Sequence, residues 1–100
     1  MVIIMARGLI HSKEDDVCVA ITDIKAGEEV ICAYLENPSD YIVVKSLQDI
    51  PLGHKIALRD LKRGEKVLKY GRAIGEAVQD IRRGEHVHIH NIRSLRWRVK

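Results

Sequence analysis

The octapeptide DLKRGEKV, residues 60–67, decides the fold because its pattern occurs twice more within only 100 residues. Residues 23–30 read DIKAGEEV and residues 80–87 read DIRRGEHV, so the copies share Asp, an aliphatic residue, a cation, Gly, Glu and a final Val. The Asp can accept hydrogen bonds from backbone amides just ahead of it, the aliphatic side chain enters the core, and the Gly supplies a positive φ. The pattern therefore predicts a turn that ends one element and starts a strand.

Extended segments flank each copy. Period-2 alternation begins after the Gly of each copy, in residues 28–34, 65–71 and 85–91. Another extended run precedes the Asp of each copy, in residues 17–22, 55–59 and 73–79. Residues 41–47 are also β-branched, and the best helical candidate, residues 46–50, is at most a turn or two long. We expect one mostly β domain over residues 1–100, with seven to nine short strands in a compact barrel-like or clip-like arrangement.

The formal net charge of +3 hides an asymmetry between the two halves of the chain. Residues 1–50 carry four Lys or Arg against nine Asp or Glu, whereas residues 51–100 carry thirteen against five. A basic half can attract an anionic substrate, a nucleic acid or an acidic partner surface, and composition alone does not separate these from an ordinary solvated surface.

Cysteine usage and hydropathy favour a cytoplasmic protein without a membrane segment. Cys18 and Cys32 lie inside apolar runs without a C-x-x-C motif, which predicts buried reduced thiols. The N-terminal stretch MVIIMARGLI has no basic start and no small-residue cleavage pattern. No apolar run approaches the length that spans a bilayer.

A family resemblance is carried by residues 53–91, GHKIALRDLKRGEKVLKYGRAIGEAVQDIRRGEHVHIHN, and by residues 11–30, HSKEDDVCVAITDIKAGEEV. These segments resemble the SAF-type β-clip domain of altronate and galactarate dehydratases, with its motifs in order and at the family's spacing. The same domain resembles the small subunit of two-chain sugar-acid dehydratases and of sulfolactate sulfo-lyase. Two positions depart from the family pattern, since Asp16 stands where Asn is usual and Ser12 where Pro is common.

The resemblance implies a lyase small subunit of carbohydrate metabolism that acts with a large catalytic subunit. The implied reaction is a hydro-lyase step that dehydrates a sugar acid, altronate or galactarate, to a 2-keto-3-deoxy acid. The alternatives are a sulfolactate sulfo-lyase small subunit and a non-catalytic carbohydrate-binding module. The resemblance also implies a divalent metal, Fe²⁺ or Mn²⁺, bound here or only with the large subunit.

Three histidines alternate in EHVHIHN, residues 85–91. On a strand, His86, His88 and His90 would line one face, with Val87 and Ile89 on the core face. The three would span about 13 Å, so at most two adjacent imidazoles could ligate one ion, given metal–nitrogen bonds of about 2 Å. Further ligands would come from His54, His11 or a partner.

We interpret His54, His86 and His88 as candidate catalytic residues, because imidazoles act as acid or base near neutral pH. His86 and His88 are the candidate metal ligands, and any single one could instead be an ordinary strand histidine. The candidates for substrate binding are Lys55, Asn91 and His11. Tyr70 is interpreted as a core aromatic and Gly75 as a backbone requirement.

Residues 92–100, IRSLRWRVK, offer cations and an aromatic ring that could stack on a base. The remaining cations are scattered over the turns and form no continuous aromatic platform. We therefore expect no nucleic-acid partner, and expect Arg93, Arg96, Trp97, Arg98 and Lys100 to meet the large subunit or a second copy in a homo-oligomer.

Overall fold

The computed structural model describes residues 6–94, and these residues form nine strands and no helix. The strands are β1 (Gly8–Ile10), β2 (Val17–Ala20), β3 (Glu29–Tyr34), β4 (Asn37–Lys45), β5 (Lys55–Ala57), β6 (Lys66–Lys69), β7 (Arg72–Ala77), β8 (His86–Val87) and β9 (Ile92–Ser94). The predicted mostly β class and strand count are confirmed, whereas the helical turn at residues 46–50 does not form. Among the described residues there is therefore no helix that could cross a bilayer.

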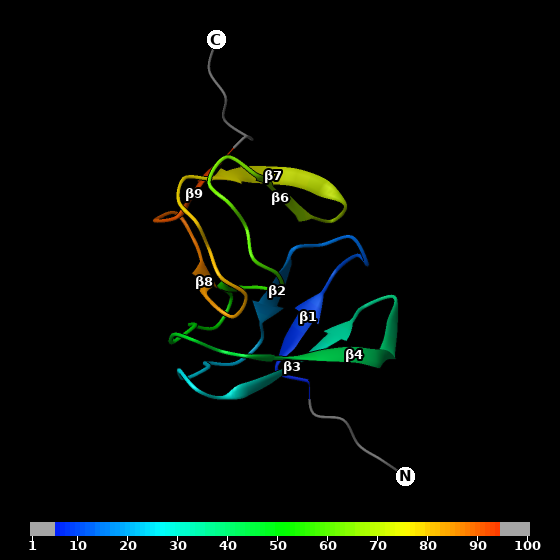
Figure 1. Ribbon diagram of the computed structural model, residues 1–100. Coiled ribbons are helices and arrows are strands. Elements are labelled where there is room, and N and C mark those ends of the chain that lie inside the picture. The colour runs from blue at the N-terminus through cyan, green and yellow to red at the C-terminus, as the bar shows by residue number, and fades with distance from the viewer. Residues whose placement is uncertain (1–5, 95–100) are drawn as a thin grey trace.

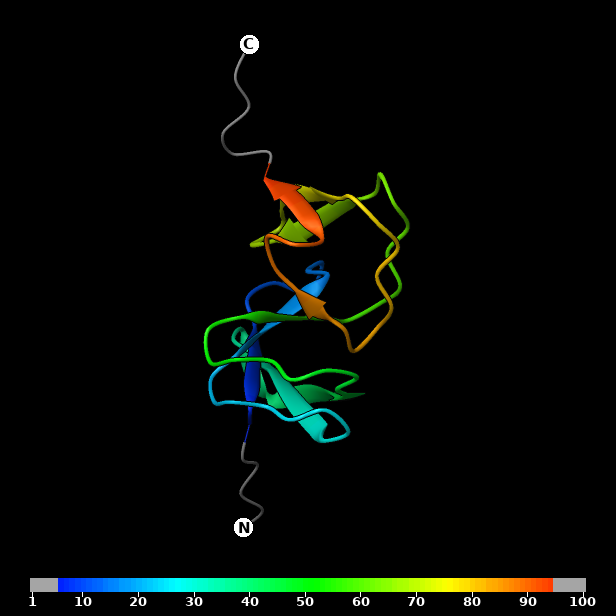
Figure 2. The ribbon, with the colours of Figure 1, turned by 90° about the vertical axis from the view of Figure 1, so that its left-hand side faces the viewer.

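Two sheets make up the molecule, as Figures 1 and 2 show. The larger has the order β4-β3-β1-β2-β5-β8 and the smaller the order β6-β7-β9. Only the pairing of β1 with β3 is parallel among these strands. The chain enters the small sheet after β5, returns for β8, and leaves again for β9. This return places β8 beside β5.

The repeat predicted from the sequence builds the turns, and the structure reveals a fourth copy. Residues 49–56, DIPLGHKI, adopt the same turn, in which His54 N–H donates to the Pro51 carbonyl at 2.9 Å. The other three copies have the same contact between their sixth and third residues. The fifth residue is Gly in all four copies, with φ between 86° and 92°. The left-handed region favours Gly, which explains this position.

The four copies associate in two pairs. Ile24 and Ile50 exchange backbone hydrogen bonds between the first two copies, and Leu61 and Ile81 do so between the last two. Each pair has its own hydrophobic core: Ile24 and Ile50 belong to one cluster of buried residues, Leu61 and Ile81 to the other. The chain is thus built from two similar halves.

The role expected for the repeated Asp needs a correction. Its carboxylate accepts from the fourth residue of the paired copy, not from an amide just ahead of it. Asp60 accepts from the Arg83 amide at 2.8 Å, and Asp80 from the Arg63 amide at 2.9 Å. Asp23 and Asp49 are related in the same way to the amides of Leu52 and Ala26. The Asp therefore joins two copies, and a long-range partner of this kind has no local sequence signal.

Two further predictions about packing are confirmed. Cys18 and Cys32 are free thiols and both are fully buried. Gly75 is a backbone requirement, because a Cβ atom there would lie 2.9 Å from the carbonyl oxygen of Arg93 on β9. The small sheet depends on this close approach between β7 and β9.

Candidate functional site

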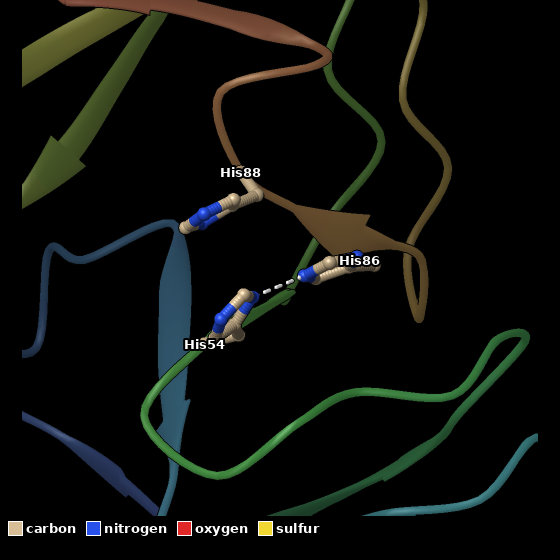
Figure 3. A group of neighbouring side chains, drawn as sticks. All are labelled: His54, His86 and His88. Atoms are coloured by element: carbon tan, nitrogen blue, oxygen red, sulfur yellow. Dashed lines mark hydrogen bonds between the residues drawn. The ribbon is translucent and has the colours of Figure 1, made fainter.

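His54, His86 and His88 converge at the junction of the two halves (Figure 3). His54 immediately precedes β5, which belongs to the first half, and His86 starts β8, which belongs to the second. The two strands pair antiparallel, with Ile56 opposite His86 and Lys55 opposite Val87. His54 Nδ1 lies 2.8 Å from His86 Nε2, and the rings of His54 and His88 stack with centroids 4.0 Å apart. We call these three residues the histidine group.

Pro51 explains why a histidine can occupy position 54. In the other three copies, the sixth residue is Glu and its carboxylate accepts the N–H of the third residue, at 2.5 to 2.6 Å. In residues 49–56 the third residue is Pro51, which has no N–H to donate. The side chain at position 54 is therefore released from capping the turn and is available for chemistry.

The predicted strand over residues 85–91 is wrong beyond Val87. Val87 is fully buried as expected, but Ile89 is 83% exposed instead of facing the core. The strand ends because the chain must turn from the large sheet towards β9. Asn91 fixes this turn: its Oδ1 accepts the His88 N–H at 2.9 Å and its Nδ2 donates to the His86 carbonyl at 2.7 Å. The turn, and not strand alternation, brings His88 over His54.

Asn91, a candidate for substrate binding, is only 3% exposed. Both ends of its amide are used by the backbone of His86 and His88. It acts as a positioning residue within this chain. Gln48 is a second positioning residue, which no motif in the sequence indicated: its Oε1 accepts the His86 N–H at 2.8 Å.

Burial and neighbouring charges favour the neutral forms of His86 and His88 near pH 7. Burial, followed by the neighbouring His54, His90 and His88, lowers the pKa of His86 to about 4. Burial, followed by His54 and Lys55, also lowers the pKa of His88. A neutral imidazole presents a lone pair, so His86 and His88 can each bind a metal ion or accept a hydrogen bond donor.

The ligand nitrogens of His54, His86 and His88 all lie within 4.8 Å of one another. Around an ion with metal–nitrogen bonds of about 2.1 Å, two ligand nitrogens are at most about 4.2 Å apart. The three residues therefore fit one divalent ion after small side-chain rotations. Sequence reasoning had selected His86 and His88 as ligands. The structure brings His54 to them, whereas His90 is exposed and lies outside this group.

Tyr70 is not a core aromatic, because it is 59% exposed. It lies with Gly71 in the two-residue turn between β6 and β7, and its φ of 58° is unusual for a residue other than Gly. Asp15 holds this turn by accepting the N–H groups of Tyr70 at 3.0 Å and Gly71 at 2.9 Å. The His11 ring lies against that of Tyr70, with centroids 4.0 Å apart and the planes tilted by 33°, so His11 is placed beside this turn and outside the histidine group.

Asp16, where the family pattern has Asn, is a buried acceptor. Its Oδ1 accepts from Arg59 Nε at 2.7 Å, and its Oδ2 accepts from the Leu68 N–H at 2.9 Å. Both contacts use acceptor atoms only, so a carboxylate serves this position. The terminal cations Arg96, Arg98 and Lys100, together with Trp97, lie outside the described residues.

Comparison with known proteins agrees with this architecture. Residues 6–95 match the altronate/galactarate dehydratase SAF domain. The chain belongs to this family. Since the match covers nearly the whole chain, the histidine group lies within the SAF domain itself.

Relatives of this SAF domain carry two kinds of name. The (2R)-sulfolactate sulfo-lyase subunit alpha of Chromohalobacter salexigens is 36% identical over 89% of this chain and 95% of the relative. The protein of that name from Paracoccus pantotrophus is 43% identical over 68% of this chain and all of the relative. The altronate dehydratase of Bacillus subtilis is 42% identical over 82% of this chain, but this covers only 15% of that relative.

Proposed function

We propose that this chain is the small subunit of a hydro-lyase that dehydrates a sugar acid of the altronate or galactarate type. In this proposal the histidine group contributes to a site that a large subunit completes. The observation that carries the proposal is the convergence of His54, His86 and His88 from the two halves of the chain. The SAF domain match and the names of its relatives, dehydratase and sulfo-lyase, support the reaction class.

The reaction makes definite demands on the site. The C–H bond next to the carboxylate breaks, the β-hydroxyl leaves as water, and the enol that forms becomes the 2-keto-3-deoxy acid. The proton removed is weakly acidic, so the developing charge on the carboxylate must be stabilised. The leaving hydroxyl must also be protonated. The hydrogen-bonded pair of His54 and His86 can hold and transfer one proton between their nitrogens.

The histidine group can also serve as a binding site for a divalent ion. We propose that His86 and His88 hold this ion and that His54 completes the set, as a third ligand or as the group that moves the proton. When bound, the ion would polarise an oxygen of the substrate carboxylate. Imidazole suits Fe²⁺ better than Mn²⁺, which prefers oxygen ligands, so the donor set favours Fe²⁺.

A second candidate is a sulfo-lyase of the (2R)-sulfolactate type. The observation in its favour is that two relatives, 36% and 43% identical to this chain, carry that name. The demands on the site are similar, because a proton is again lost next to a carboxylate while a group leaves from the β-carbon. The two candidates therefore differ in substrate and leaving group more than in the use of the histidines.

Reconstitution tests the proposed function. We expect no turnover by the purified chain alone, because its histidines form only part of the site. Co-purification with a large dehydratase-like chain encoded beside it should give turnover of altronate, galactarate or (2R)-sulfolactate, assayed with Fe²⁺, Mn²⁺ and Mg²⁺. Turnover by the chain alone would contradict the subunit role, and an assembled complex inactive on all three acids would contradict the reaction class.

Metal binding can be measured without turnover. Titration of the purified chain with Co²⁺, followed by its visible absorption, should give saturable binding that His86→Ala and His88→Ala each weaken by at least about tenfold. His90→Ala is the matched control, because this neighbouring exposed histidine is outside the group. Equal weakening by all three substitutions would mean non-specific binding to surface imidazoles.

A further inference from the structure

A groove of about 600 Å³ opens between the two sheets. Lys55 of the large sheet lines it, opposite Lys69, Tyr70 and Arg72 of the small sheet, with Ile74 and Ile92 among its apolar lining. The volume is in the range of small-molecule sites. Lys55 directly follows His54, at the start of β5. The groove and the histidine group are therefore neighbours.

The three cations of this groove are not neutralised within the described residues. The ion pairs found among residues 6–94 involve Arg7, Arg59, Lys66 and Arg93, and none of them uses Lys55, Lys69 or Arg72. Asp15 is the carboxylate near Lys69, but its oxygens accept backbone N–H groups of Ser12, Tyr70 and Gly71. Burial, followed by Lys55, lowers the pKa of Lys69. The ammonium groups of Lys55 and Lys69 thus line the groove without a carboxylate that forms an ion pair with either of them within the described residues.

The strained turn at Tyr70 adds a second observation. Turns of two residues with positive φ usually carry Asn-Gly or Asp-Gly, which adopt this conformation at little cost. Here the first position is a tyrosine, held at φ 58° by hydrogen bonds to Asp15, and its ring lines the groove. Strain maintained by a buried carboxylate is typical of functional sites. The turn places the Tyr70 ring in the groove lining, with Lys69 Nζ 5.2 Å from the ring centroid.

We propose that this groove binds an anionic group of the substrate, a carboxylate or a sulfonate, through Lys55, Lys69 and Arg72, with the Tyr70 hydroxyl as a further donor. That the anion belongs to the substrate rests on the proposed function, whereas anion binding itself does not. A small anion fits better than an acidic partner surface, because the cations line a concavity that also has an apolar wall. Lys69, Tyr70 and Arg72 then position the acid beside the histidine group.

Titration of the ¹⁵N-labelled chain with malonate and, separately, with methanesulfonate tests this groove. We expect saturable amide shifts at Lys55 and at residues 69–72 with at least one anion, and none with uncharged ribitol at equal ionic strength. Lys55→Met and Lys69→Met should each raise the apparent Kd about tenfold or more, since hydrogen bonds to charged groups are the stronger class. Tighter binding of malonate indicates a carboxylate subsite, and tighter binding of methanesulfonate a sulfonate subsite.

Lys66→Met is the matched control, because Lys66 lies on the same strand as Lys69 but pairs with Glu76 outside the groove. Absence of shifts with both anions, or equal weakening by Lys66→Met and Lys69→Met, would overturn the proposal. The same holds if only an acidic segment of a partner chain shifts these amides. Anion binding in the groove without turnover by the assembled complex would overturn only the proposed function. Turnover that Lys69→Met leaves unchanged would overturn only the proposal that the groove binds an anionic group of the substrate.

Discussion

Replacement of His54 by alanine should reduce kcat of the assembled complex by about 10²–10⁴-fold, the usual contribution of a positioned acid or base. His54 Nδ1 lies 2.8 Å from His86 Nε2, and its ring stacks on His88, so its loss removes the residue that links the other two. Under the proposed function, turnover requires His54 whether this residue binds the ion or transfers the proton. Steady-state kinetics on the reconstituted complex measure the effect, and thermal unfolding of the chain shows whether the fold persists.

His90→Ala controls for this prediction, because the His90 ring lies 5.1 Å from that of His86 while the residue is exposed and outside the group. We expect less than about a threefold change in kcat from His90→Ala, since no direct role is lost. A His54→Ala complex that keeps the parent kcat would remove His54 from the site. Equal losses at His54 and His90 would instead indicate a general effect of the histidine-rich surface.

A double substitution separates stability from function at the same position. Pro51→Lys with His54→Glu restores the lysine and glutamate that the first and third copies of the repeat use to close their turns. The chain should be at least as stable as the parent, because the new carboxylate can accept the restored N–H group. It should also be as inactive as His54→Ala. An inactive but stable chain would show that His54 is present in residues 49–56 for function, in place of a glutamate that would cap the turn.

The turns were predictable because each copy of the repeat is local. Asp, Gly and Glu occur at fixed spacing, and each of the three predicted copies does form a turn that leads to a strand. The copy at residues 49–56 was missed because Pro51 and His54 replace the basic residue and the Glu of the pattern. The same two differences mark the candidate site, so departure from the repeat was the signal that could have located it. How the copies pair could not be predicted, because their side-chain contacts join residues 17 to 29 positions apart.

His54, His86 and His88 lie together in the structure, but the arrangement of the last two was predicted from the wrong element. Alternation in residues 85–91 favoured a strand, which would have separated His86 from His90 by about 13 Å. The ring centroids of these residues are 5.1 Å apart, because the chain turns at Asn91. A side-chain amide that binds its own backbone competes with strand pairing, and hydrophobic alternation does not reveal that competition.

Gly84→Ala should destabilise the chain by about 2–5 kcal/mol, more than the same substitution at Gly27 or Gly64. All three glycines have φ between 90° and 92°. At Gly27 and Gly64 a Cβ atom would meet nothing within 4 Å, so alanine there costs only the left-handed conformation, about 1–2 kcal/mol. At Gly84 the Cβ would lie 2.3 Å from the Lys45 carbonyl oxygen and 3.2 Å from Leu47 Cγ. Overpacking of this kind adds about 1–3 kcal/mol.

Urea unfolding of the three alanine variants measures the difference in their free energies of unfolding. All three share the strain of the left-handed conformation, but only Gly84→Ala brings a Cβ atom close to Lys45 and Leu47. If Gly84→Ala costs no more than Gly64→Ala, the end of β4 can move away from the last copy of the repeat. That movement would also affect the site. The Leu47 N–H donates to the Gly84 carbonyl at 2.9 Å, and Gln48 accepts the His86 N–H, so the same segment that presses on Gly84 positions His86. A rigid contact at Gly84 is therefore a condition for placing the His86 imidazole 2.8 Å from His54.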